Sequence, residues 1–165
     1  MKNTDQELAR LAVRVGRHLL RTERLAATAE SCTGGWIAKT LTDIAGSSQW
    51  FSEGFVTYSN DAKVRRLGVP RAVLKAEGAV SEAAARAMAM GALVRSGAQV
   101  AVAVTGIAGP GGAVPGKPVG TVWLAWAVTQ GRKIRVTAEH RHFKGDRDAV
   151  RRKTVRAALA GVLGR

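Results

Sequence analysis

The stretch Gln99-Val100-Ala101-Val102-Ala103-Val104-Thr105-Gly106-Ile107-Ala108-Gly109-Pro110 indicates the fold more clearly than any other part of the sequence. Its first half is a nearly continuous apolar run with valine at alternate positions, which is typical of a central strand covered on both faces. The run then changes into a glycine- and proline-rich loop that continues to Pro118, and a loop of that length suggests a functional role. We therefore expect a buried strand that leads into a functional loop.

Working outward from this strand, apolar periodicity and turn residues predict the other elements. Helices are expected over residues 8–19, behind a capping box of Thr4 and Glu7, and over residues 36–44, 81–95 and from Asp146 onward, with a short helix carrying Lys63 after Asn60 or Asp61. Strands are expected over residues 25–28, 55–59, 99–104, 121–129 and 134–143, the last two as a hairpin.

Helices and strands alternate early and a hairpin comes late, so the fold class that we expect is α/β, a three-layer α/β/α sandwich with a mixed, mostly parallel sheet. A single domain over residues 1–165 fits the length, since no linker, repeat or low-complexity segment is visible. In open α/β sheets the ligand sites lie beyond the strand ends. Three loops of small residues are expected there: residues 31–35, 46–48 and 105–112.

Composition excludes several classes of protein. The 26 Lys and Arg against 12 Asp and Glu give a formal net charge of +14, which favours phosphate, nucleic acid or another acidic partner. One cysteine and three histidines exclude a disulfide scaffold and a zinc-finger array. No apolar run reaches the roughly 18 residues of a membrane span, and residues 1–7 are polar and unlike a signal peptide. We expect a soluble, cytoplasmic protein without a membrane partner.

Several common chemistries find no support among the motifs. The glycine loops match neither the Walker A spacing nor the dinucleotide fingerprint, and tight turns alone explain them equally well. Cys32 could act as a nucleophile, but a lone cysteine is more often a small buried filler. His140 and His142 could share a strand face, yet two histidines without a third ligand do not favour a metal site.

Serine chemistry with a lysine base is the remaining candidate. Attack by serine needs a base, and lysine can serve once burial or nearby positive charge lowers its pKa from about 10.4. Lys63 suits this role because it follows a strand among small residues, with Tyr58 available to relay or orient a proton. Spacing alone favours the alternative, a solvated helix residue. Five serines lie near the proposed loops: Ser31, Ser47, Ser48, Ser52 and Ser59.

A basic region follows the hairpin and has two interpretations. Its seven cations could form a nucleic-acid face, or most could coat a solvated helix. We favour the second, with Arg147 after the turn at Gly145 and Asp146 binding a single phosphate in a bidentate pair. The cations are Arg141, Lys144, Arg147, Arg151, Arg152, Lys153 and Arg156.

Seven segments, taken together and in this order, resemble the CinA C-terminal domain family, the nicotinamide-nucleotide amidases, over nearly the whole chain. They are Ala29-Glu30-Ser31-Cys32-Thr33-Gly34-Gly35, Ala45-Gly46-Ser47-Ser48, Val56-Thr57-Tyr58-Ser59-Asn60, Gly78-Ala79-Val80-Ser81, Gly106-Ile107-Ala108-Gly109-Pro110, Lys117-Pro118-Val119-Gly120-Thr121-Val122 and Gly145-Asp146-Arg147.

The resemblance implies hydrolysis of the carboxamide of nicotinamide mononucleotide to nicotinate mononucleotide and ammonia, in pyridine nucleotide salvage, without metal or cofactor. It implies a stand-alone domain and a homo-oligomer. By motif position, Ser48 would be the nucleophile, Lys63 its general base and Tyr58 part of the proton relay, with Thr105 beside them. The substrate-binding residues would be Ser31, Gly46, Gly106 and Arg147.

Two alternatives from other functional classes stay open at this point. The basic balance is compatible with a competence- or DNA-damage-associated accessory protein that binds DNA, and the fold could also persist as a module that binds nucleotide without catalysis. Ammonia release from nicotinamide mononucleotide separates the amidase from both.

Overall fold

The computed structural model describes the chain from Lys2 to Arg165, with side chains from Asp5 onward, so the side chain of Thr4 and its expected capping box lie outside the described part. The helices are α1 (Lys2–Arg21), α2 (Trp36–Thr42), α3 (Asn60–Leu67), α4 (Arg71–Glu77), α5 (Glu82–Ser96) and α6 (Arg147–Val162), with one 3-10 turn, η1 (Ser47–Gln49). The strands are β1 (Ala26–Glu30), β2 (Phe51–Val56), β3 (Val100–Gly106), β4 (Thr121–Gln130) and β5 (Lys133–His142).

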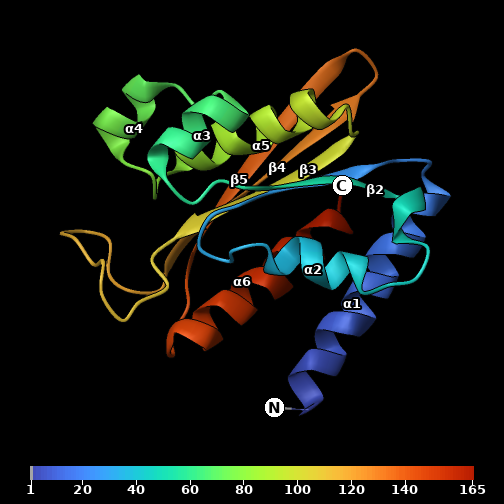
Figure 1. The fold of residues 1–165 in the computed structure, drawn as a ribbon, viewed down its shortest axis with the longest axis horizontal. Coiled ribbons are helices and arrows are strands. Elements are labelled where there is room, and N and C mark those ends of the chain that lie inside the picture. The colour runs from blue at the N-terminus through green and yellow to red at the C-terminus, as the bar shows by residue number, and fades with distance from the viewer. Residues whose placement is uncertain (1) are drawn as a thin grey trace.

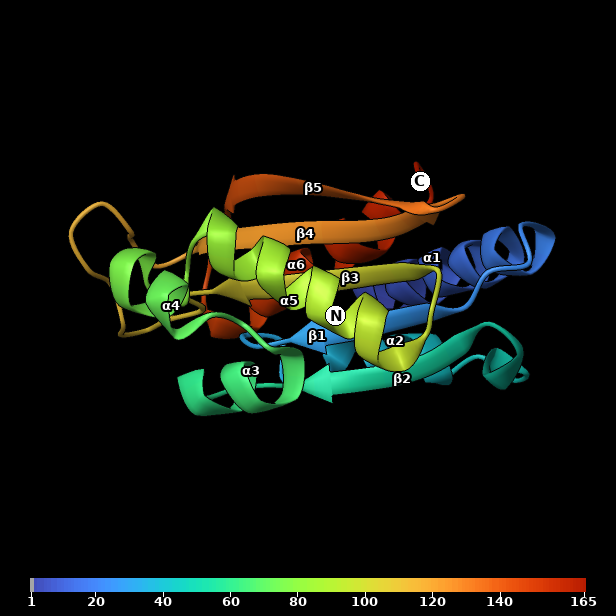
Figure 2. The same ribbon diagram turned by 90° about the horizontal axis from the view of Figure 1, so that it is seen from above.

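The five strands form one mixed sheet in the order β2-β1-β3-β4-β5, which Figure 2 shows from above. Strand β1 pairs in parallel with both β2 and β3, whereas β3 with β4 and β4 with β5 are antiparallel. The expected mixed sheet is confirmed, with two parallel and two antiparallel pairings. The reason lies in the connections: a parallel pair needs a long crossover, while a short turn at Gly131 joins β4 to β5.

Helices cover both faces of the sheet, as expected for three layers. Figure 1 shows α3, α4 and α5 on one side and α1, α2 and α6 on the other. The alternation in β3 serves both layers, because Val100, Val102 and Val104 face the core under α1 and α6, whereas Ala101 and Ala103 face the core under α5. Strand β3 therefore presents its larger side chains to one core and its smaller ones to the other.

The alanine-lined face lets α5 pack closely. A Cβ atom added at Gly91 would lie 2.0 Å from the carbonyl oxygen of Leu67, so α5 meets the end of α3 backbone to backbone. The other layer is also tight, since the indole of the buried Trp126 lies over Gly161 and donates a hydrogen bond to the carbonyl of Ala158 at 3.1 Å. Both contacts fix the helices that carry site residues.

Two details differ from the sequence prediction. The strand expected over residues 55–59 runs from Phe51 to Val56, because β2 is an edge strand whose mostly exposed side chains give little apolar signal. Helix α4 was not predicted: it buries none of its residues, so it has no apolar stripe to detect. The remaining elements are observed near their expected positions. In the part of the chain that is described, no helix is long and apolar enough to cross a membrane.

Candidate active site

Three adjacent strand ends meet at one edge of the sheet. Ser31 directly follows β1, Tyr58 follows β2, and Thr105 and Gly106 end β3. These ends enclose a cavity of about 210 Å³ that also receives residues from α3, the segment before α5 and the start of α6. Its lining consists of Ser31, Cys32, Tyr58, Asn60, Lys63, Ala79, Val80, Thr105, Gly106, Ala108 and Arg147. A site at the carboxyl ends of the parallel strands is where an open α/β sheet places its ligand.

Lys63 is the most unusual group in this cavity, because only 1% of it is exposed. Ser59 caps the N-terminus of α3 by accepting a hydrogen bond from the Ala62 amide at 3.1 Å, so Lys63 lies in the first turn and reaches back over the strand ends. Its Nζ lies 3.1 Å from the Ser31 Oγ, within hydrogen-bond distance. A lysine and a serine from separate segments therefore meet in a buried cavity.

The surroundings of the Lys63 amine suit its neutral form. Burial lowers the pKa of Lys63 from its ordinary value of 10.5, and among the described residues no carboxylate makes a salt bridge with it. Nζ donates to the carbonyl oxygens of Thr57 at 2.8 Å and Tyr58 at 3.2 Å. A neutral amine has two N–H donors and one lone pair, so these two carbonyls leave the lone pair available to accept the Ser31 proton.

The fully buried carboxylate of Glu30 fixes the loop that carries Ser31. Its Oε2 accepts hydrogen bonds from the Thr33 hydroxyl at 2.7 Å and from the amides of Gly35 at 3.1 Å and Ile37 at 2.9 Å. Its Oε1 accepts a fourth from the Ala38 amide at 2.8 Å. One carboxylate thus satisfies amides at the start of α2 and holds the loop against it.

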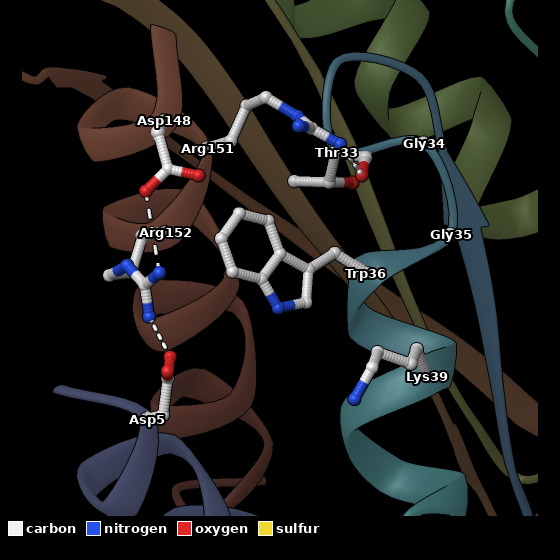
Figure 3. A pocket seen from close by; sticks show the side chains of 9 residues that line it. All are labelled: Asp5, Thr33, Gly34, Gly35, Trp36, Lys39, Asp148, Arg151 and Arg152. Atoms are coloured by element: carbon white, nitrogen blue, oxygen red, sulfur yellow. Dashed lines mark hydrogen bonds and ion pairs between the residues drawn. The ribbon is translucent and has the colours of Figure 1, made fainter. Parts of the chain in front are cut away.

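Arg151 holds the same loop from the opposite side. It donates from Nε to the Cys32 carbonyl at 3.1 Å and from Nη2 to the Thr33 carbonyl at 2.9 Å. Figure 3 shows this side chain reaching from α6 toward Thr33, past the indole of Trp36. The guanidinium lies 5.3 Å from the centre of the indole ring, a cation–π distance. The Ser31 loop is therefore held between α2 and α6.

Two backbone amides after Ser31 have no hydrogen-bond acceptor among the described residues, and one of them belongs to Cys32, which lines the cavity. Within the described residues, the N–H groups of Cys32 and Thr33 donate to no other group, whereas the Ser31 amide donates to the Val104 carbonyl at 3.1 Å. An unpaired amide directly after a nucleophile is the arrangement that stabilises negative charge on a carbonyl oxygen in hydrolases. The loop thus provides donors suited to an oxyanion.

The structure does not bring Ser48 to Lys63, which corrects the dyad expected from motif position. Ser48 is exposed in η1, before β2, whereas Lys63 lies in α3, after it. The strand between them spans about 16 Å at roughly 3.3 Å per residue, and Figures 1 and 2 show the two segments at opposite ends of it. Gly46 caps η1 at the same distant end and does not line the cavity. Ser31 replaces Ser48 as the serine within reach of the base.

The other expected serines also lie outside the cavity or serve another purpose. Ser47 is in η1, and Ser52 near the start of β2 donates to the Ser96 carbonyl at 3.4 Å. Ser59 caps α3. Ser31 is thus the one serine of the five that lines the cavity.

Tyr58 and Arg147 meet at the mouth of the cavity. The Tyr58 side chain is 61% exposed, and its hydroxyl accepts a hydrogen bond from Arg147 Nη2 at 3.0 Å. Lys63 bonds to the backbone carbonyl of Tyr58 and not to its hydroxyl. The phenol therefore does not make the contact with Lys63 that the expected proton relay requires. Arg147 also donates to the Gly109 carbonyl at 2.6 Å. A guanidinium held at the entrance is well placed to receive an anionic group.

Thr105 and Cys32 line the cavity without an evident chemical role. The Thr105 hydroxyl donates to the Ala79 carbonyl at 2.7 Å, which ties β3 to the segment before α5. Burial raises the pKa of the Cys32 thiol to about 12, so the thiolate needed for nucleophilic attack is disfavoured. His140 packs against Trp123, and among the described residues no group of three or more potential ligands could hold a metal ion.

Comparison with known proteins shows which family the chain belongs to. The CinA C-terminal domain family matches residues 8–165. The chain belongs to this family. Among its relatives, the nicotinamide-nucleotide amidohydrolase PncC of Pseudomonas putida is 56% identical over 153 residues, covering 93% of both chains. The protein of the same name from Escherichia coli strain K12 is 52% identical over 156 residues, covering 94% of this chain and 93% of the relative.

Solved structures of similar proteins share the fold of this CinA C-terminal domain. The competence/damage inducible protein CihA of Agrobacterium tumefaciens has a TM-score of 0.90 at 47% identity and covers 95% of this chain and 94% of its own. The competence damage-inducible protein A of Klebsiella pneumoniae has a TM-score of 0.90 at 39% identity and covers 96% of both chains.

Two residues that organise the site of this CinA C-terminal domain were not singled out from the sequence. Glu30 gave no signal beyond its place in a motif, because its four hydrogen-bond donors come together only when the turn after β1 and the first residues of α2 have folded. Arg151 is separated by 119 and 118 residues in the sequence from the two carbonyls to which it donates, so no local pattern connects them. A lone carboxylate at the end of an apolar strand, followed by a glycine turn, was the available clue to Glu30.

Proposed function

We propose that this protein hydrolyses the carboxamide of nicotinamide mononucleotide to nicotinate mononucleotide and ammonia, with Ser31 as nucleophile and Lys63 as general base. The proposed activity is supported by two relatives that are called nicotinamide-nucleotide amidohydrolases and are 52–56% identical to this chain over nearly the full length of both chains. The observation that carries the mechanism is the 3.1 Å contact between the Lys63 Nζ and the Ser31 Oγ in a buried cavity.

The first half of the reaction forms an ester on Ser31. Neutral Lys63 accepts the hydroxyl proton as Ser31 Oγ bonds to the amide carbon, and the carbonyl oxygen becomes an oxyanion facing the free amides of Cys32 and Thr33. The C–N bond then breaks, and the Lys63 ammonium donates its proton to the leaving nitrogen, which departs as ammonia. The product of this half is an acyl-enzyme.

The second half repeats these steps with water in place of serine. Lys63 accepts a proton from the water as its oxygen bonds to the acyl carbon, and the oxyanion forms again at the same amides. The ester bond to Ser31 Oγ breaks, and the Lys63 ammonium returns the proton to that oxygen. The net reaction consumes one water and releases nicotinate mononucleotide, with serine and lysine restored.

Arg147 is the proposed phosphate-binding residue. It lies at the cavity mouth, where a bidentate guanidinium can bind the phosphate while the amide end of the substrate reaches Ser31. Its present partner, the exposed Tyr58 hydroxyl, is a neutral acceptor that an anionic oxygen can replace. Before substrate binds, Tyr58 would hold Arg147 at the mouth, and this role replaces the proton relay expected from the sequence. Thr105 and Gly106 would shape the cavity wall.

Ammonia release by the purified protein tests this proposal. Nicotinamide mononucleotide should be hydrolysed, and nicotinamide riboside, which lacks the phosphate, should be a much poorer substrate. Arg147→Ala should raise KM for the mononucleotide by about 10-fold or more, since hydrogen bonds to charged groups contribute about 1.5–3 kcal/mol, with a smaller change in kcat. Arg71→Ala, at an exposed arginine on α4, is the matched control.

Absence of ammonia release from folded protein would overturn the proposed activity. Equal hydrolysis of the riboside and the mononucleotide would overturn the role of Arg147 while leaving the dyad intact. The homo-oligomer, the single domain and the cytoplasmic location expected from the sequence stay predictions.

A further inference from the structure

Helix α1 exposes a row of four arginines: Arg10, Arg14, Arg17 and Arg21. Their spacing of four, three and four residues puts them on one helical face. The opposite face of α1 is buried in the core and contributes Leu8, Leu11, Ala12, Val15 and Leu19. The arginine row therefore points away from the molecule along the whole length of the helix.

The charges of the arginine row are not compensated. Among the described residues, no carboxylate forms a salt bridge with any of the four, and Arg21 alone has a side-chain partner, His18 at 3.4 Å. The acidic residues of α1 serve other cations: Asp5 pairs with Arg152, and Glu7 pairs with Arg156, both on the neighbouring α6. The row thus keeps four positive charges on a protein whose net charge is already +14.

We propose that the arginine row binds the phosphate backbone of a nucleic-acid duplex without sequence preference. From Arg10 to Arg21 the row is about 16 Å long at 1.5 Å per residue. One strand of B-DNA places a phosphate about every 3.4 Å along the axis, so this length faces roughly five phosphates. Four guanidinium groups in a line match that charge density, and arginine binds phosphate oxygens in bidentate geometry.

Other acidic partners fit this face less well. A single-stranded nucleic acid binds through stacking on aromatic side chains, and α1 contains no Phe, Trp or Tyr. A membrane-surface helix inserts its apolar face into the lipid, but the apolar face of α1 is buried in the protein core. Leu20, 47% exposed, is the one large hydrophobic side chain that the described part of the helix leaves exposed. A linear array of charge without an apolar anchor favours a duplex.

The arginine row is separate from the catalytic cavity, so duplex binding is independent of the proposed amidase activity. None of its four members lines the cavity at the strand ends. Figure 1 shows α1 on the opposite face of the sheet from α3, the helix that carries Lys63. Neutralising the row should leave ammonia release from nicotinamide mononucleotide unchanged.

The test uses fluorescence anisotropy with a labelled 20-base-pair DNA duplex of mixed sequence, titrated at several salt concentrations. The variant carries Arg10→Gln, Arg14→Gln, Arg17→Gln and Arg21→Gln. If each arginine contacts one phosphate, the slope of log affinity against log salt should decrease in magnitude by about 3.6, at about 0.9 per phosphate. Equivalently, the four contacts account for an affinity loss of about 150-fold between 50 and 200 mM salt.

A control variant removes the same charge from the opposite face, by Arg65→Gln, Arg66→Gln, Arg71→Gln and Lys75→Gln on α3 and α4, where all four side chains are exposed. The control should keep nearly the full salt slope of the unmodified protein. Equal loss in both variants, or no loss in the first, would overturn the proposal in favour of non-localised charge. Binding to phosphatidylserine vesicles but not to the duplex would also overturn it. Ammonia release and the thermal midpoint confirm that each variant is folded.

Discussion

Glu30→Gln tests whether the buried carboxylate organises the Ser31 loop. The substitution keeps the shape of the side chain but replaces one oxygen with an amide nitrogen and removes the charge. In its better orientation the glutamine oxygen takes the place of Oε2 and keeps three bonds, while its NH₂ group faces the Ala38 amide, another donor. One hydrogen bond is therefore lost, and three change from charge-assisted to neutral.

These losses give the expected magnitude. A hydrogen bond to a charged group contributes about 1.5–3 kcal/mol and a neutral one about half as much. Losing one such bond and half of three others should lower the unfolding free energy by roughly 4–7 kcal/mol. For a domain of this size that corresponds to a decrease in Tm of roughly 8–28 °C. Because the loop carries Ser31 and the free amides, kcat should also fall more than KM rises.

Urea unfolding, followed by circular dichroism, measures the stability, and ammonia release at a temperature where the variant is folded measures kcat. Glu82→Gln is the matched control, because Glu82 is half-exposed and pairs with Arg86 four residues later on α5; such pairs contribute at most about 0.5 kcal/mol. If Glu30→Gln lost less than about 1 kcal/mol, the reasoning about the buried carboxylate would be refuted.

Two further predictions concern the base and the packing. Since burial lowers the Lys63 pKa and the neutral amine is the reactive form, kcat/KM should rise with pH through that lowered pKa and level off above it, still below 10.5; a rate that falls over this range would exclude Lys63 as base. Gly91→Ala should lower the unfolding free energy by about 1–3 kcal/mol because its Cβ would overlap the Leu67 carbonyl, whereas Gly164→Ala, which meets nothing within 4 Å, should leave Tm nearly unchanged.

The elements with strong local signals could be predicted from the sequence. The valine alternation of β3 is a two-residue period, and both cores use it. The alanine-rich run of α5 and the hairpin of β4 and β5 are similarly local. Edge strand β2 and helix α4 were misplaced or missed, because exposed elements carry little of the apolar periodicity that reveals buried ones.

The candidate site was only partly predictable, for a related reason. Lys63 could be recognised as a base candidate because a strand and a helix cap lie directly before it. The serine that partners Lys63 could not be chosen in the same way, because Ser31 and Ser48 both lie in motifs that the sequence analysis singled out. Only the pairing of β1 with β2 places Ser31, and not Ser48, beside the Lys63 amine. Choosing between the serines requires the sheet order, which depends on long-range contacts.

The comparison of Ser31→Ala with Ser48→Ala tests the central claim most directly. Ammonia release from nicotinamide mononucleotide is measured for both variants under conditions where circular dichroism shows each to be folded. Ser31→Ala should lose at least about a thousandfold in kcat, as serine hydrolases do without their nucleophile, and Ser48→Ala, at the far end of β2, should keep nearly all of it. Full activity without the Ser31 hydroxyl, or loss of activity without that of Ser48, would contradict the assigned dyad.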